Sequence, residues 1–189
     1  MPNTTKPALE ASLKKLLLHK PLDKITINDL TTDCGISRMS FYYHFKDIYD
    51  LVEWVCVEDG KQALQGKKTY DTWQEGLLQV FEAILENKPF IQNVYRSIGK
   101  EKIENYLHKL TYGLIVNVVE EKCVGTDVAE EERAFIAEFY KFGFVGIILG
   151  WIDRGMKEDY REITEKMSVV LRGNITNSIH NFEQVGRKQ

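Results

Sequence analysis

Cysteine is scarce in this sequence. The three cysteines, Cys34, Cys56 and Cys123, are odd in number, widely spaced and embedded in apolar helical patterns. A disulfide framework needs pairs, and a zinc site needs closely spaced cysteine and histidine ligands. We therefore expect reduced core thiols, with no disulfide, no metal and no cofactor.

A long hydrophobic run is also lacking. The longest nearly uncharged stretch, Phe142 to Ile152, is enclosed by Lys141 and Asp153, which leaves it far shorter than the ~20 residues that span a bilayer. Near the N-terminus, charged residues interrupt the apolar block around Leu16, so a signal peptide is not expected. The sequence thus predicts a cytoplasmic protein without a membrane partner, and a buried helix at 142–152.

No excess of positive charge is present. The net charge is −3, although residues 1–50 hold seven Lys/Arg against six Asp/Glu and the remainder holds 18 against 22. A strongly basic nucleic-acid coat is therefore excluded. A DNA-binding surface, if present, must be local and built from a few well-placed groups.

Helical periodicity dominates the chain, and only four prolines interrupt it. We predict an all-α fold of about nine helices, with a helix-turn-helix domain at 1–49 and a helical ligand-sensing and dimerisation domain at 50–189. The fourth helix is expected to join the two domains. The predicted helices cover residues 7–20, 27–34, 38–45, a segment from 47, 72–87, 90–97, 100–122, 128–155 and 159–183.

Two short helices separated by a glycine form the most informative segment. Thr26 and Asp29 match a capping box, Gly35 is suited to end the first helix, and Ser37 is a natural N-cap for the second. This spacing is typical of a helix-turn-helix, whose second helix enters the major groove of DNA.

The second of these helices carries more polar groups than a core face would. Arg38 is the candidate base reader, because arginine can donate two hydrogen bonds to guanine. The other candidate DNA-binding residues are Thr26, Ser37, Met39, Ser40, Tyr42, Tyr43, His44 and Lys46, mostly as phosphate contacts. The alternative is that the aromatic cluster is only the core of a small bundle; for His44 alone, a packed neutral side chain stays open.

The segment ITINDLTTDCGISRMSFYYHFKDIYDLV is similar to the DNA-binding signature of the TetR family, from Ile25 to Leu51. The resemblance implies phosphate contacts from Thr26, Tyr42, Tyr43 and His44, and base or groove contacts around Ser37, Arg38, Met39 and Ser40. One departure is Ile48, where the family commonly has lysine; Lys46 is the nearest candidate replacement. The C-terminal half resembles the subfamily related to dihydroxyacetone kinase regulators.

The C-terminal half is rich in aromatic residues, and the family resemblance implies that some of them line a ligand pocket. An ordinary aromatic core is the competing interpretation for each single residue. The candidate pocket residues are Phe81, Tyr95, Tyr106, Tyr112, Phe139, Phe144 and Trp151.

A homodimer is expected, because one short recognition helix contacts too few bases to select a genomic site. TetR-like proteins pair through their last two long helices. Glycines at 143, 146 and 150 weaken a helix by roughly 1 kcal/mol each, which close approach of another helix, a packing groove within the chain or room for a ligand would offset. The interface candidates are Phe135, Phe139, Gly143, Gly146, Ile163, Met167, Val170, Leu171 and Ile175; closure of the monomer's own core is the alternative for several of them.

These patterns lead to a first functional hypothesis of a repressor that a small molecule releases from a palindromic operator. The alternative is a regulator or co-activator whose C-terminal domain binds a partner protein; an apolar pocket of ~300 Å³ or more would count against it. An enzyme is not expected, because the four histidines are scattered and no nucleophile or phosphate-binding motif is present.

Overall fold

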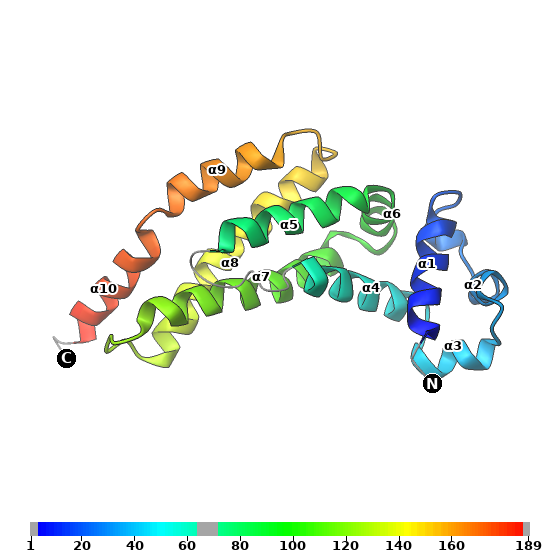
Figure 1. Ribbon diagram of the computed structural model, residues 1–189, viewed down its shortest axis with the longest axis horizontal. Coiled ribbons are helices and arrows are strands. Elements are labelled where there is room, and N and C mark those ends of the chain that lie inside the picture. Colours follow the sequence, from blue (N-terminus) through cyan, green and yellow to red (C-terminus); the bar gives the residue numbers. More distant parts are fainter. Residues whose placement is uncertain (1–3, 64–71, 187–189) are drawn as a thin grey trace. The chain divides into compact units, whose positions relative to one another are not determined.

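The structure, a computed structural model, describes residues 4–63 and 72–186, and within these ranges every regular element is helical. The predicted all-α class is therefore confirmed (Figure 1). A short 3₁₀ helix, η1 (Leu22–Lys24), follows the first α-helix. The α-helices are α1 (Thr5–Leu17), α2 (Ile27–Cys34), α3 (Arg38–His44), α4 (Ile48–Ala63), α5 (Trp73–Glu86), α6 (Lys88–Ile98), α7 (Lys100–Cys123), α8 (Glu130–Asp153), α9 (Tyr160–Leu171) and α10 (Asn174–Gly186).

The last long helix predicted from the sequence, 159–183, is in fact two helices. Gly173 adopts a φ of +75°, in the left-handed region, between the end of α9 and the start of α10. A left-handed residue cannot continue a right-handed helix, and glycine adopts this conformation without steric cost. The prediction failed because the apolar spacing continues across Gly173 and hides the break.

The described chain divides into two compact units. One unit contains the residues up to Asp59 together with Glu86–Tyr106, and the other contains Gly60–Leu85 and the residues from Leu107 onward. The predicted boundary at residue 49 differs from this division, because α6 packs against α1 and η1 in the first unit. The side-chain amide of Asn93 on α6 donates a hydrogen bond of 3.1 Å to the carbonyl oxygen of Leu17 at the end of α1.

The second unit is built around α8. Trp151 is completely buried, its indole N–H donates to the carbonyl oxygen of Glu158 at 2.9 Å, and its ring meets Phe81 edge-on at 5.0 Å. The helix is long and apolar enough to cross a membrane by length and composition, but half of its most apolar window is buried within the unit. Its apolar character is therefore explained in part by the core that it forms.

The three thiols are free, but only Cys123 is buried. Cys34 and Cys56 are half-buried, so the expectation of three core thiols holds fully for Cys123 alone. The Cys34 thiol donates to the carbonyl oxygen of Ala8 at 3.3 Å, and burial raises the pKa of Cys56 to about 12. A thiol with so high a pKa is protonated near neutral pH and is a poor nucleophile.

Candidate nucleic-acid interface and ligand pocket

The turn between α2 and α3 has the geometry expected from the sequence. The Thr26 hydroxyl accepts from the backbone N–H of Asp29, Gly35 ends α2 with a φ of +66°, and the Ser37 hydroxyl accepts from the backbone N–H of Ser40 at 3.1 Å. These bonds satisfy helix-end groups that would otherwise lack partners. They fix where α2 ends and where α3 begins.

Helix α3 separates an apolar side from a polar one. Phe41 and Phe45 are buried with exposed fractions of 0% and 3%, whereas Met39 and Tyr43 are 81% and 85% exposed. The buried pair anchors α3 in the small core of the first unit. The same anchoring turns the other side of the helix outward, and this pattern argues against an aromatic cluster that serves only as core.

The outward side carries two cationic groups and a phenol that have no hydrogen-bond or ion-pair partner in the part of the chain that the structure describes. Arg38, Tyr42 and Lys46 are exposed, and their side chains form no hydrogen bond or ion pair within residues 4–63 and 72–186. Ser37 is also exposed, while Ser40 and His44 are half-buried. Unpaired donors on a short helix and just after its end are suited to contacts with phosphate oxygens and base edges.

Thr26 is placed differently from the other candidates, because its hydroxyl is already engaged. It donates to the Asp29 carboxylate at 2.8 Å, and that carboxylate also accepts from the Thr26 backbone N–H and from Lys20 Nζ, each at 2.7 Å. A phosphate contact from this hydroxyl would have to compete with Asp29. Hydrogen bonds from Lys20 and from Thr26 hold the pKa of Asp29 down at about 2.

The lowered pKa of Asp29 predicts a pH-dependent contribution to stability. The ionised carboxylate stabilises the fold above the ordinary pKa of 3.8, and this stabilisation is lost as the pH falls toward about 2. Asp29→Asn should lower the thermal unfolding midpoint at pH 7 by a few degrees and have little effect near pH 2. Asp23→Asn, which removes an exposed carboxylate 3.8 Å from Lys24, is the matched control; an equal penalty for Asp29→Asn at both pH values would contradict the prediction.

One cation near α3 was not found from the sequence. Lys6 on α1 lies with its ammonium nitrogen 5.3 Å from the ring centroids of both Phe45 and Trp54. Only the folded first unit brings these residues together, and no local motif signals the contact. Lys6 therefore adds positive charge close to the end of α3.

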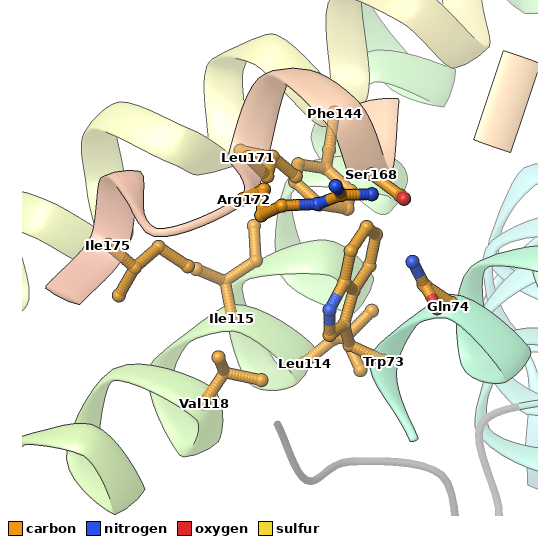
Figure 2. A pocket seen from close by; sticks show the side chains of 10 residues that line it. All are labelled: Trp73, Gln74, Leu114, Ile115, Val118, Phe144, Ser168, Leu171, Arg172 and Ile175. Atoms are coloured by element: carbon orange, nitrogen blue, oxygen red, sulfur yellow. The ribbon is translucent and has the colours of Figure 1, made fainter. Parts of the chain in front are cut away.

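A pocket of about 270 Å³ lies in the second unit. Figure 2 shows its lining, which comes from α5, α7, α8, α9, α10 and the residue that follows α9. The lining residues are Trp73, Gln74, Leu114, Ile115, Val118, Phe144, Ser168, Leu171, Arg172 and Ile175. Of the seven residues predicted to line a pocket, only Phe144 does so here.

The other predicted pocket residues lie elsewhere. Phe81 and Trp151 are in the closed core of the second unit, whereas Phe139 is 65% exposed on α8. Tyr95 and Tyr106 fall in the first unit. Tyr112 is half-buried, with Lys141 Nζ 5.6 Å from its ring. The presence of aromatic residues in the sequence does not show which of them line a pocket, which fill the core and which are exposed.

The predicted interface residues fall into two groups. Phe135, Phe139, Gly143 and Gly146 are exposed along α8, and Val170 is exposed on α9. Ile163 is half-buried and Met167 is buried, while Leu171 and Ile175 line the pocket. Only the four residues on α8 present a continuous helical face, with members three or four residues apart.

The fold and these two sites define a class of protein, the helix-turn-helix DNA-binding proteins that carry a second, helical unit. The family model described as "Transcriptional regulator C-terminal region" (TetR_C_8) matches residues 71–173, more than half of the chain. The chain therefore belongs to the TetR family of transcriptional regulators. Members of this family bind DNA, are typically dimers and are not enzymes.

Individual relatives agree with this assignment. The chain is 22% identical over 153 residues to the "HTH-type dhaKLM operon transcriptional activator DhaS" of Lactococcus lactis subsp. lactis (strain IL1403), covering 80% of this chain and 81% of the relative. A solved structure of the "Dihydroxyacetone kinase operon activator DhaS" matches with a TM-score of 0.72 at 20% identity, over 91% of this chain and 96% of that one.

A more distant solved structure is the TetR family repressor AlkX from Dietzia sp. strain DQ12-45-1b. It matches with a TM-score of 0.54 at 11% identity, over 91% of this chain and 95% of that one. One relative is thus named an activator and another a repressor. The shared fold does not decide the sign of regulation.

Proposed function

We propose that the chain binds a palindromic DNA operator as a homodimer, with α3 of each copy in the major groove. The observation that supports this proposal is the outward side of α3 with the residues that follow it, where the side chains of Arg38, Tyr42 and Lys46 are exposed and form no hydrogen bond or ion pair within the described chain. Arg38 is proposed to read bases, and the tyrosines, His44 and Lys46 to contact phosphates. Such a regulator would act in the cytoplasm.

Dimerisation is proposed to occur through α8, on the face formed by Phe135, Phe139, Phe142, Gly143, Gly146 and Ile147, all of them exposed. The two glycines support this proposal. Apart from its chain neighbours and the adjacent backbone of α8, a Cβ atom added at Gly143 or Gly146 would meet no atom of the described chain within 4 Å. Packing inside one copy therefore does not explain residues that cost roughly 1 kcal/mol each in helix propensity. Close approach of a second copy would explain them.

Helix α10 extends the same face. Phe182 on α10 lies 6.4 Å from the ring of Phe135, and the hydroxyls of Tyr140 and Ser178 are 3.2 Å apart. Exposed aromatic side chains at the centre of a surface are typical anchors of protein interfaces. The proposed interface therefore joins α8 and α10, and the exposed valines of α9 are not part of it.

A small molecule is proposed as the signal, and the pocket of about 270 Å³ in the second unit supports this proposal. Its volume is slightly below the roughly 300 Å³ at which the range for ligand sites begins, so a regulator that binds a partner protein stays the alternative. The predicted mode remains release of a repressor from its operator. The similarity to an operon activator, over 80% of the chain, favours activation as the second candidate.

Selection of DNA from a random pool by the purified full chain tests operator binding. The selected sites should be two-fold symmetric, with half-site centres separated by about one helical turn or a multiple of it. Footprinting should protect both half-sites at one protein concentration. Enrichment of asymmetric or unrelated sequences would contradict the proposal. Transcription in vitro from a promoter carrying the selected site then shows whether binding represses or activates.

A further inference from the structure

The pocket in the second unit has one polar end and one apolar end. Figure 2 shows the polar groups of Arg172, Ser168 and Gln74 toward one end, together with the Trp73 ring, and Ile115, Val118 and Ile175 toward the other. A pocket of this kind fits a molecule that is itself polar at one end and apolar at the other.

The charge of the polar end comes from Arg172. This residue follows α9 directly, and no Asp or Glu side chain is among the described residues that line the pocket. Within residues 4–63 and 72–186 the Arg172 side chain forms no ion pair and no hydrogen bond. A guanidinium group has five donors in a planar fork that matches a carboxylate. The polar end is therefore suited to an anionic head group.

The remaining polar groups at this end are also unused. The Trp73 indole N–H, the Gln74 amide and the Ser168 hydroxyl form no hydrogen bond within the described ranges. Each can donate one to an oxygen atom of a ligand. A single guanidinium balances one negative charge, so a singly charged carboxylate fits better than a doubly charged phosphate ester.

The size of the pocket limits the apolar part of the ligand. At about 30 Å³ for each water-sized group, a volume of about 270 Å³ holds roughly nine such groups. A carboxylate with a chain of six to eight carbons has about this size. The apolar end, lined by aliphatic side chains from α7 and α10, would bury that chain.

We infer that this pocket binds a small amphipathic carboxylate, whose head group pairs with Arg172 and whose chain lies against α7 and α10. Because the polar end is formed by α5 and by the junction of α9 with α10, the ligand connects the start of one helix to the break between two others. Binding itself is independent of DNA; its role as the regulatory signal rests on the proposed function.

Isothermal titration calorimetry of the full chain with octanoate tests the inference. Octanoate should bind about 10- to 100-fold more tightly than 1-octanol, as expected for a charge-assisted hydrogen bond. Arg172→Gln should remove this preference and leave the affinity for 1-octanol unchanged, and Arg172→Lys should keep part of it. Octyl phosphate serves as the second anion, and tighter binding of it than of octanoate would overturn the carboxylate assignment.

Lys166→Gln is the matched control, because it removes a positive charge from the exposed side of α9, where Lys166 lies 3.8 Å from Glu162 and outside the pocket. This variant should bind octanoate like the wild type. No detectable binding of octanoate at a concentration tenfold above about 1 mM would overturn the inference. Equal octanoate affinity of the wild type and of Arg172→Gln would also overturn it.

Footprinting of the same preparations separates this inference from the proposed function. A wild-type chain that protects its operator but does not bind octanoate refutes only the ligand assignment. A chain that binds octanoate through Arg172 but selects no symmetric DNA site supports the ligand assignment and refutes the operator proposal.

Discussion

Replacing both Arg38 and Tyr42 with alanine is expected to abolish specific operator binding while the fold is retained. Each good bidentate contact with a base contributes about 1–3 kcal/mol, so loss of Arg38 from both half-sites corresponds to about 2–6 kcal/mol, or roughly 30- to 10⁴-fold in affinity. Loss of Tyr42 removes a phosphate contact and adds a sequence-independent decrease. The measurement is a mobility-shift titration on the selected operator at fixed salt concentration.

Two single variants test base recognition by Arg38 separately from phosphate contact by Tyr42. Arg38→Ala should reduce the preference for the operator over unrelated DNA, whereas Tyr42→Phe should weaken binding to both about equally. Both side chains are exposed and form no hydrogen bond or ion pair within the described chain, so circular dichroism and the unfolding midpoint should be unchanged. Arg161→Ala, which removes an exposed arginine from α9, is the control. Wild-type binding by the double variant would refute the assignment of α3.

The helix-turn-helix was predictable because its determinants are local. The capping pair Thr26 and Asp29, the left-handed Gly35 and the N-cap Ser37 each act within a few residues of their position. The short apolar spacing then places Phe41 inside and Tyr43 outside without reference to the rest of the chain. Sequence patterns of this range therefore predicted both the elements and the exposed candidates.

The pocket was not predictable in the same way, because it depends on contacts between distant segments. Trp73 on α5, Leu114 on α7 and Arg172 beside α9 meet only in the folded second unit. Large aromatic residues were favoured as candidates, but Phe81 and Trp151 pack against each other and fill the core. The sequence alone does not show that Arg172 lies in a pocket, because the residues around it come from distant parts of the chain.

The break at Gly173 shows how a local backbone conformation affected the prediction of the pocket. The periodicity of 159–183 predicted Leu171 and Ile175 as interface residues on one continuous helix, but the left-handed Gly173 lies between them, after the end of α9 and before the start of α10. Both residues therefore line the pocket, where the sequence had suggested an interface. The sequence pattern thus predicted that Leu171 and Ile175 lie on an apolar surface, but it did not predict which surface.

Phe139→Glu is expected to convert the proposed dimer to a monomer at micromolar concentration. The side chain is 65% exposed in one copy, so the substitution costs little within the monomer. Because the proposed interface is two-fold symmetric, the substitution introduces a negative charge twice, once from each copy. Loss of an aromatic anchor from an interface costs about 2 kcal/mol or more. Sedimentation velocity should show at least a ~30-fold rise in the dimer dissociation constant, and operator affinity should fall with it.

Gly146→Leu gives an independent test of the same face. In one copy an added Cβ meets nothing within 4 Å beyond its chain neighbours and the adjacent backbone of α8. Leucine is also the better helix former by roughly 0.8–1 kcal/mol, so the monomer should not be destabilised. Across a close contact between two copies of α8, the larger side chain should separate the helices and weaken the dimer. Val124→Glu, an exposed apolar residue after α7, is the control for added charge. If Phe139→Glu and Gly146→Leu stay dimeric while Val169→Glu dissociates, the interface lies on α9, because Val169 is exposed on that helix and outside the α8 face.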